Sequence, residues 1–350
     1  GNPSATIQGG ISAGILWFIR QGNINLNYPT TIVLATSNGA RFLVEQLDSL
    51  IAQTETHWTL LIRDDGSNDA TPDIIQRFAE QDERIKILGN DGTVYGSALR
   101  NFSILLQAAF AHGAEYVFCC DQDDVWSPRQ LEIMLAGIKQ LEGQGRGPSL
   151  VHHDLVVVND ALEPVADSFI ELSQLHPSDQ LRPQRLISRN EVTGCAMACN
   201  RALLEIALPI SNQAVMHDWW LALCAGFFGR LAFIPDRLVQ YRQHGDNTIG
   251  AKSFWHGLNP FTNWFAGWRR GDEEFISTVK QARAFRVTME AQLDKDSERY
   301  VALELYGGML SATRWKRLKL LRDFSMWRSH WLLNMVLIMR MLLLPREPET

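Results

Sequence analysis

The chain has 350 residues, of which 46% are hydrophobic and 21% are charged, as is ordinary for a globular protein with a sizeable core. This length allows one large domain with an appendage, or two domains. The net charge of −6 is unevenly distributed, because residues 1–250 carry 17 basic and 28 acidic side chains and residues 251–350 carry 16 and 11. An acidic body argues against nucleic acid as a partner, whereas the basic tail could meet anionic lipid.

The cysteine content indicates the cellular compartment. Five cysteines are present, Cys119 and Cys120 are adjacent, and no C-x-x-C pair occurs. This usage is typical of a reduced, cytoplasmic protein and argues against a disulfide framework or a zinc site. No secretory signal peptide is expected, because residues 9–19 are only mildly apolar and no basic region precedes them. We therefore assign no function to residues 1–27.

Short apolar strands alternate with amphipathic helices in the first part of the chain. Strands are expected at residues 31–35, 58–62, 84–88 and 116–120, with helices between them. This alternation predicts βαβ units, and hence a mostly parallel sheet flanked by helices. Neither G-x-G-x-x-G nor G-x-x-x-x-G-K-[ST] is present, so dinucleotide and P-loop chemistry are disfavoured.

The strand at residues 116–120 ends in three closely spaced carboxylates, those of Asp121, Asp123 and Asp124. Carboxylates at the C-terminal edge of a buried strand lie where open α/β sheets bind ligands. A divalent cation would relieve their mutual repulsion, and an acidic surface turn is the alternative. A helix should follow, with Ser127 as its N-cap and Pro128 at its first position.

The second half of the chain begins after a flexible break at residues 143–148. Further strands are expected at residues 150–158, 191–199 and 231–234. The polar segment 160–190 is predicted to be a mobile loop near a substrate. An apolar helix should begin at the sequence His-Asp-Trp-Trp, residues 217–220, and end near Gly229.

The last hundred residues combine aromatic, basic and apolar segments. Aromatic side chains crowd residues 254–268, five basic side chains lie between residues 314 and 322, and residues 331–344 are almost entirely apolar. Fourteen helical residues span about 21 Å, less than the roughly 30 Å hydrocarbon core of a bilayer. We expect an interfacial helix at a membrane, and the alternative is a helical cap packed on the preceding domain.

Seven segments resemble, in order and spacing, the inverting glycosyltransferases of family 2, which have the GT-A fold. They are residues 35–39, 64–67, 100–101, 119–126, 193–195, 217–220 and 241–247. The motifs C-D-Q-D-D-x-W, H-D-W-W and Y-R-Q-H-G-x-N are most similar to bacterial rhamnosyltransferases of surface-polysaccharide synthesis. The resemblance implies an α/β GT-A domain at residues 28–252. An N-terminal extension at residues 1–27 precedes it, and a C-terminal helical, membrane-associating region at residues 253–350 follows.

The resemblance also implies residues for the nucleotide-sugar donor. A metal ion, Mg²⁺ or Mn²⁺, is expected on Asp121, Asp123 and His244. The implied donor-binding residues are Thr36, Asn38, Asp64, Asp65, Arg100, Asp121 and Arg242. The alternatives are an Asx turn at residues 64–65, an ordinary surface arginine at position 100 and a structural Arg242–His244 pair. Family members commonly have Tyr or another base-stacking residue where this chain has Ser37, which weakens the expected aromatic contact with the base.

On the acceptor side, Asp218 is implied to be the general base that deprotonates the attacking hydroxyl. Apolar neighbours raise a carboxylate's pKa and make it a better proton acceptor. The alternative for Asp218 is an N-cap of the helix that it opens. Gly194, Trp219 and Trp220 are the implied acceptor-binding residues, although both tryptophans suit a core equally well. His217 is predicted to be structural.

Together these inferences predict a metal-dependent inverting glycosyltransferase on the inner face of a bacterial membrane. The expected donor is dTDP-L-rhamnose, and the expected acceptor is a lipid-linked saccharide. The alternative is a nucleotide-sugar or glycan-binding protein of the same fold without turnover. A sugar-nucleotide pyrophosphorylase is disfavoured, because residues 36–39 are not the basic, glycine-rich loop that such an enzyme needs.

Overall fold

The computed structural model describes residues 29–347 except 90–91, 144, 146, 176, 178–182, 245–263, 325–326 and 328–330. The described strands form one sheet with the order β3-β2-β1-β4-β8-β6-β9-β5, and β7 pairs with β6. Their bounds are β1 Thr30–Thr36, β2 Trp58–Asp64, β3 Ile85–Ile87, β4 Tyr116–Cys120, β5 Val125–Trp126, β6 Ser149–Val158, β7 Pro164–Ala166, β8 Met197–Asn200 and β9 Arg230–Arg242.

The first half of the sheet is parallel, and the second half is mixed. β1 is parallel to both β2 and β4, so that Val33 lies level with Leu61 and Cys119. β3 is parallel to β2, which confirms the four strands predicted from the N-terminal sequence. β8 is antiparallel to β4 and β6, whereas β6 and β9 are parallel. The carboxyl ends of β1, β2 and β4 therefore meet at one edge, where α/β sheets bind ligands.

Helices cover both faces of this sheet because the strand side chains alternate in direction. Ile32 and Leu34 of β1 share one apolar cluster with α2, α3 and α5, and Val33 belongs to another that includes α4, α8 and α9. The helix bounds are α2 Leu43–Ile51, α3 Thr71–Gln81, α4 Ala98–Ala111, α5 Gln130–Gly143, α6 Phe169–Leu172, α7 Pro183–Ser188, α8 Arg201–Ala207, α9 His217–Phe228, α11 Trp264–Thr288, α12 Glu298–Gly307, α13 Arg314–Asp323 and α14 Trp331–Leu343.

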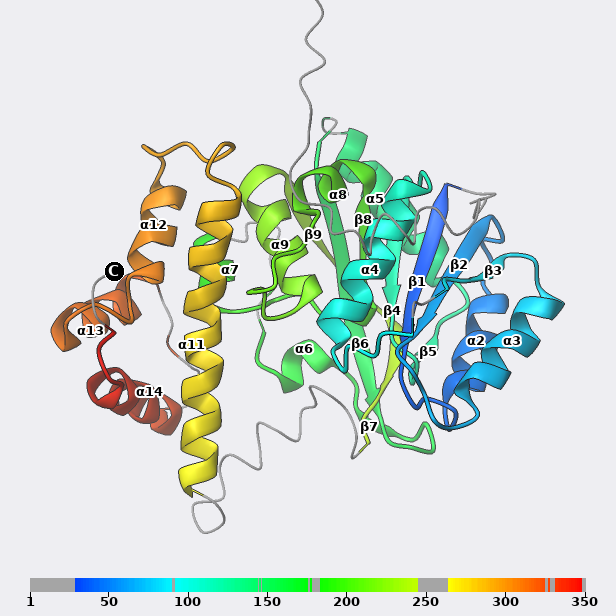
Figure 1. The fold of residues 1–350 in the computed structure, drawn as a ribbon, viewed down its shortest axis with the longest axis horizontal. Helices are drawn as coiled ribbons and strands as arrows, with labels where there is room; N and C mark the ends of the chain where they lie inside the picture. The colour runs from blue at the N-terminus through cyan, green and yellow to red at the C-terminus, as the bar shows by residue number, and fades with distance from the viewer. Residues whose placement is uncertain are drawn as a thin grey trace, which may run out of the picture.

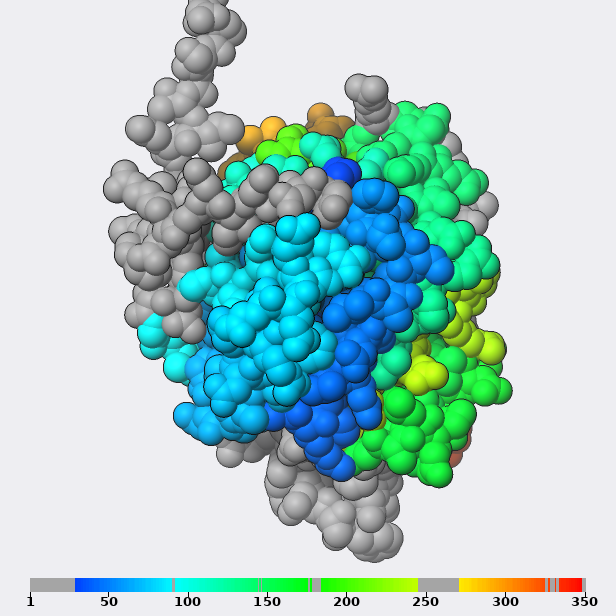
Figure 2. All heavy atoms as spheres, turned by 90° about the vertical axis from the view of Figure 1, so that its right-hand side faces the viewer, coloured from blue at the N-terminus to red at the C-terminus, as the bar shows by residue number. Residues whose placement is uncertain are grey.

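The sheet and the C-terminal helices occupy different ends of the molecule. α11 to α14 lie at the end opposite to α2 and α3, and α9 and α7 lie between them and the sheet (Figure 1). Seen from the side of α2 and α3, the surface is formed mainly by the N-terminal strands and helices, in blue and cyan (Figure 2).

Three local predictions are corrected by the structure. The segment 160–190 is not a plain loop, because its described part contains β7, α6 and α7. The strand expected over residues 191–199 begins only at Met197, after a 3₁₀ turn over Gly194–Ala196. The helix expected from Pro128 begins at Gln130, because residues 128–129 form a turn in which the Gln130 N–H donates to the Ser127 carbonyl at 3.0 Å.

The C-terminal helices share a core with the sheet domain. Phe285 of α11 packs against Trp220 and Phe227 of α9, with ring centroids 5.3 and 5.2 Å apart. Leu303 and Tyr306 of α12 are fully buried in the same apolar cluster. In the described part of the chain, no helix combines the length and the apolar character needed to cross a bilayer. The aromatic side chains predicted to crowd residues 254–268 lie outside the described side chains.

Candidate active site

Three carboxylates follow β4, as the sequence predicted, and the structure divides them between two environments. Asp123 Oδ2 lies 2.8 Å from His244 Nε2. Asp124 is fully buried, and its Oδ1 accepts a hydrogen bond from the Arg242 backbone N–H at 3.1 Å. Asp124 Oδ2 accepts no hydrogen bond from a nitrogen or oxygen donor among the described residues. The Cys195 thiol, a weak donor, is the side chain that hydrogen-bonds to the Asp124 carboxyl. Asp121, Asp124 and Cys195 bring their ligand atoms within 4.8 Å of one another.

This crowding changes the protonation of the carboxylates. Burial, reinforced by the charges of Asp123 and Asp218, raises the pKa of Asp121 to about 7. Burial and the charge of Asp123 raise the pKa of Asp124 as well. Negative charge is therefore costly here without a positive partner, and carboxylate oxygens are ligands that suit Mg²⁺ and Mn²⁺. Among the described residues, the ligand atoms that converge for a cation are those of Asp121, Asp124 and Cys195, whereas the predicted ligands Asp123 and His244 pair with each other.

Asp218 lies at the N-terminus of α9, on the other side of this site. Its Oδ1 accepts from the Trp219 backbone N–H at 2.6 Å, and the Asn190 side chain and the Gly194 N–H also donate to its carboxylate. Burial nevertheless outweighs these hydrogen bonds and raises the pKa of Asp218 to about 7. A carboxylate with this pKa can accept a proton near neutral pH.

Gly194 and His217 border Asp218. A Cβ atom on Gly194 would lie 3.1 Å from His217 Nε2 and 3.5 Å from Asp218 Oδ2, so a larger residue would crowd both. The His217 ring stacks on Phe102 with centroids 3.9 Å apart, and burial lowers its pKa to about 3. Neither ring nitrogen of His217 has a hydrogen-bond partner among the described residues. This histidine is therefore neutral and adjoins the predicted base.

The two tryptophans of the H-D-W-W sequence are buried. The Trp219 indole N–H donates to the Leu186 carbonyl at 2.6 Å, and that of Trp220 donates to the Ala207 carbonyl at 3.0 Å. Trp220 has no exposed surface, and Trp219 is only 8% exposed. These positions favour the core alternative over an exposed platform for the acceptor sugar.

Arg242 holds the carboxylate segment onto β9. Its Nε donates to the Asp123 carbonyl at 2.8 Å, its Nη1 donates to the Asp160 carbonyl, and its Nη2 pairs with Glu45. The side chain is 1% exposed. The structure therefore gives Arg242 a positioning role.

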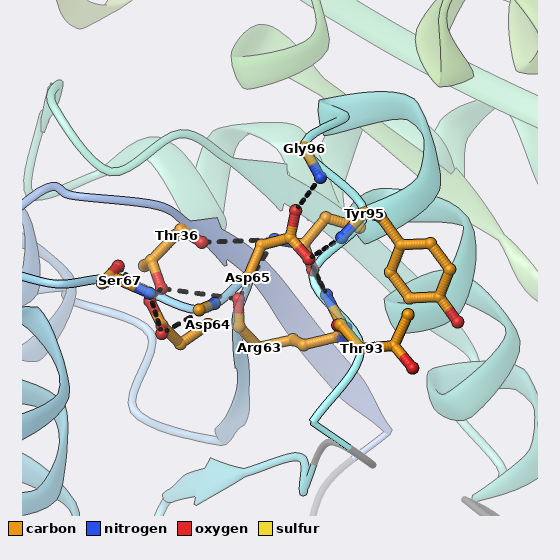
Figure 3. A network of polar contacts seen from close by, with 10 residues as sticks. Thr36, Arg63, Asp64, Asp65, Ser67, Thr93, Tyr95 and Gly96 are labelled. Carbon is orange, nitrogen blue, oxygen red and sulfur yellow. Dashed lines mark hydrogen bonds and ion pairs between the residues drawn. The ribbon is translucent and has the colours of Figure 1, made fainter.

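At the ends of β1 and β2, the predicted donor-binding carboxylates are held by a polar network (Figure 3). Asp64 Oδ1 accepts from Thr36 Oγ1 at 3.0 Å and from Ser67 Oγ at 2.5 Å. Asp65 accepts from Tyr95 N and Gly96 N at 3.0 and 2.8 Å. Together these bonds fix the residue 93–96 segment beside the ends of β1 and β2.

The matching family model is that of glycosyl transferase family 2, and it covers residues 31–206, half of the chain. The chain belongs to this family. The matched region contains the carboxylate cluster and Gly194 and ends within α8, so it does not include Asp218. The chain has the GT-A fold, a mixed α/β sheet with helices on both faces and a helical C-terminal part.

Among known proteins, the chain is 32% identical over 262 residues to the putative colanic acid biosynthesis glycosyl transferase WcaA of Escherichia coli, covering 73% of this chain and 85% of WcaA. It is 27% identical over 223 residues to an uncharacterized glycosyltransferase of Nostoc sp., covering 62% of this chain. That match spans 65% of the Nostoc protein's length. Among solved structures, S. aureus TarS residues 1–349 superpose with a TM-score of 0.53 at 16% identity, covering 84% of this chain and 79% of that one.

Two of the predicted donor-binding residues lie at the rim of the site. Arg100 is exposed on the first turn of α4. Asn38 has a positive φ of 49°, and its Oδ1 accepts from Asn68 N at 2.9 Å while its N–H donates to Ser67 Oγ at 2.7 Å. Asn38 therefore links the two loops that follow β1 and β2.

Several site residues were not found from the sequence. Gln122 joins the ends of β1 and β4 through two hydrogen bonds with the Ser37 backbone, at 2.9 and 3.1 Å. Asn101 accepts from the buried Arg63 guanidinium at 2.9 Å. Asn190 and Cys195 contact the site carboxylates from segments predicted as a loop and a strand. Asn101, Gln122 and Cys195 lie inside the motifs that resemble family 2, and this position within a motif was the feature of the sequence that could have identified them as site residues.

Proposed function

We propose that this protein is an inverting, metal-dependent glycosyltransferase that moves a sugar from a nucleotide-diphosphate donor to a saccharide acceptor. The observation that supports it most directly is the placement of Asp218. This buried carboxylate has a pKa raised to about 7, and it lies close enough to Asp121 for each charge to oppose the other. A proton acceptor and a cation-binding carboxylate cluster are the two groups that this transfer requires.

The proposed chemistry is a single displacement. The acceptor oxygen bonds to the anomeric carbon while the bond from that carbon to the diphosphate oxygen breaks. The hydroxyl proton passes to Asp218, which the N–H groups of Trp219 and Gly194 and the Asn190 side chain hold in place. Because attack and departure occur on opposite sides, the configuration at that carbon inverts.

The donor is assigned to the edge formed by the ends of β1, β2 and β4. Thr36, Asn38, Asp64, Asp65 and Arg100 would border the nucleoside, and Asp121 would contact its ribose. Asp121, Asp123 and His244 would hold Mg²⁺ or Mn²⁺, which supplies positive charge for the leaving diphosphate when it is bound. Arg242 would act on the donor chiefly by keeping the backbone of Asp123 and Asp124 in place.

The acceptor is assigned to the region beside Asp218 and Gly194, where the lack of a side chain would let the backbone approach the acceptor closely. The buried positions of Trp219 and Trp220 favour a role in supporting the start of α9 over direct contact with the acceptor. We infer that the acceptor is a lipid-linked saccharide in bacterial cell-surface polysaccharide synthesis. WcaA is named for colanic acid biosynthesis, and an E. coli relative 23% identical to this chain is named a glucosyltransferase acting on a GlcNAc-diphosphoundecaprenol.

For the donor we propose dTDP-L-rhamnose, on the strength of the three motifs around Asp121, Asp218 and His244. TarS, a structural neighbour, has been solved in complex with UDP-GlcNAc, so the fold accommodates different donors. We place the enzyme in the cytoplasm, peripherally on the inner face of the cell membrane, because a lipid-linked acceptor would be met there.

The test is a panel of nucleotide-diphosphate sugars offered to the full chain, with Mg²⁺, with Mn²⁺ and with chelator. We expect dTDP-L-rhamnose to give the highest release of nucleoside diphosphate, and chelator to lower that release at least tenfold. Asp123→Ala should lower donor affinity in the presence of metal to the value that wild type shows in chelator, because the ion links protein and diphosphate.

Each outcome of this panel decides one part of the proposal. Preference for another sugar would overturn the donor assignment and leave the reaction class standing. Donor binding without turnover, even with saccharide acceptors present, would indicate a binding protein of the same fold. Equal donor affinity with metal and with chelator in the wild type would overturn the metal assignment.

A further inference from the structure

α14 is apolar around most of its circumference, and those of its described side chains that are fully buried lie on one side. Leu337, Met341 and Leu344, on or next to this helix, are buried in the core shared with α11 to α13. The opposite side presents four large apolar residues at intervals of four: Trp331, Met335, Met339 and Leu343 are 63, 51, 42 and 62% exposed. Because residues four apart share a helix face, these side chains form one continuous exposed stripe.

The neighbouring helix α13 presents positive charge. Arg314, Lys316, Lys319 and Arg322 are exposed, with Trp315, 79% exposed, among them. Asp323 is the one exposed acidic residue of α13, so this surface carries a net positive charge. Arg317 does not contribute to it, because its buried guanidinium donates to backbone carbonyls, including those of Met309 and Leu344.

We propose that α13 and α14 form a docking surface for an anionic lipid bilayer. The α14 stripe would enter the boundary between headgroups and acyl chains, with the helix lying in the membrane plane, and the α13 cations would meet the lipid phosphates. A large exposed apolar stripe needs a partner, and the adjacent cations select one that is negatively charged. Tryptophan side chains suit this boundary, where one side is apolar and the other wet.

A second copy of the chain fits this surface less well. Pairing two α14 stripes would bring two α13 helices together, and their like charges would repel. The acidic body of the protein would also be repelled by an anionic membrane, which favours an orientation with α13 and α14 toward the lipid. In the view of Figure 1, α14 lies in the lower half of the molecule. The segments α6 and β7, which follow β6 near the active site, lie in the same half.

This surface deepens the proposed function by assigning the segment that would hold the enzyme beside a lipid-linked acceptor. The assay for it needs neither donor nor acceptor, so its failure would leave the proposed reaction untouched. The full chain would be sedimented with vesicles of equal parts phosphatidylglycerol and phosphatidylcholine, and with vesicles of phosphatidylcholine alone, at low and at high salt.

Two variants separate the electrostatic contribution to vesicle binding from the apolar contribution. Replacing Arg314, Lys316, Lys319 and Arg322 with Gln should weaken binding to the anionic vesicles at least tenfold at low salt and much less at high salt, because salt screens charge. Met335→Gln with Met339→Gln should weaken binding at every salt concentration, because apolar burial is not screened. The matched controls are Arg77→Gln with Lys139→Gln, exposed cations of the sheet domain, and Val287→Gln, an exposed apolar residue of α11.

The proposal is supported if the wild type prefers anionic vesicles, both variants lose that binding, the controls keep it, and all proteins keep the same melting temperature. It is overturned if the wild type ignores anionic vesicles at low salt, or if the controls lose as much binding as the variants. A concentration-dependent dimer that the Met335→Gln, Met339→Gln variant abolishes would also overturn it and would identify a second copy as the occupant.

Discussion

We assign the proposed proton transfer to Asp218 because hydrogen bonds and burial act in opposite directions on the pKa of this carboxylate. Four hydrogen-bond donors, its own backbone N–H among them, favour its charged form, yet burial outweighs them and raises its pKa to about 7. A freely exposed aspartate is too weak a base to accept a proton efficiently at neutral pH, whereas a fully neutralised one could not act at all. The N-cap of α9 is Met216, so Asp218 is not the cap considered from the sequence; it is an acid in the first turn, where the helix dipole favours negative charge.

We predict that Asp218→Asn lowers transfer by about 10² to 10⁴ and leaves donor affinity nearly unchanged. The amide keeps the size of the side chain but cannot take the acceptor proton. Turnover with acceptor and donor affinity by calorimetry would be measured side by side. Asp323→Asn, a change on the exposed surface of α13, is the control and should be silent in both assays. More than a tenth of wild-type turnover in the Asp218 variant would place the base elsewhere.

The pH dependence of turnover should report the same carboxylate. Asp218 must be unprotonated to act, and its pKa is raised to about 7, so kcat should fall about tenfold per unit as the pH drops below that value. Saturating metal and donor remove the contribution of Asp121, whose charge the cation would then stabilise. Turnover between about pH 5 and pH 9 would be measured under these conditions. An acid limb centred near the ordinary aspartate value would show that Asp218 is either more exposed in the complex or not the base.

At the scale of elements, the buried Arg63–Asp65 pair ties β2 to the segment before α4. Arg63 is fully buried, and its Nη1 contacts Asp65 at 3.0 Å and Asn101 at 2.9 Å. Burial raises the pKa of Asp65, but hydrogen bonds from Tyr95, Arg63 and Gly96 outweigh it and hold the pKa below its usual value. The pair thus shapes the donor side of the site even if it never touches the nucleotide.

We predict that Asp65→Ala destabilises the protein by about 3 to 5 kcal/mol, because it leaves a guanidinium buried without its counter-ion. Denaturant unfolding would give the free energy. Glu132→Ala removes the partner of Arg129 in an exposed ion pair and should leave stability unchanged, since such pairs contribute little. An equally small effect at Asp65 would mean that the remaining partners of Arg63 satisfy its charge.

The sequence predicted the elements whose signals are local. The β1 to β4 strands, α9 and its end at Gly229 follow from apolar periodicity and capping residues, and the family motifs located the carboxylates and Asp218. The segment from residue 160 to 199 was less predictable. The pairing of β8 between β4 and β6 is decided by distant strands, and the hydrogen bond from Asn190 to Asp218 joins residues whose proximity no local pattern encodes.

At the scale of the whole molecule, the two sides of α13 differ: one side is buried against the neighbouring helices, and the other is exposed and basic. The sequence grouped its basic residues as one stretch, but the structure separates them. Arg317 is 1% exposed, and its guanidinium donates to the carbonyls of Met309, Leu310, Met341, Leu344 and Pro345. Burial lowers its pKa below the usual value. The C-terminal helices are therefore packed on the sheet domain, as one of the two alternatives held, and membrane contact through their exposed basic side stays a prediction.

Substitution of Arg317 should consequently lower stability, whereas substitution of Arg314 should weaken vesicle binding. Arg317→Met keeps the apolar stem but leaves buried carbonyls at the ends of α12 and α14 without donors, at about 1 to 3 kcal/mol for each group that finds no other partner. We expect a loss of at least about 3 kcal/mol in the free energy of unfolding. Arg314→Met, one turn earlier on the exposed side, should leave stability unchanged and weaken binding to anionic vesicles. Denaturant unfolding of both variants would measure the difference in stability, and vesicle sedimentation would measure the difference in membrane binding. Equal stability of the two variants would show that the carbonyls of α12 and α14 are satisfied without Arg317, and that α13 is held to the protein by its apolar residues alone.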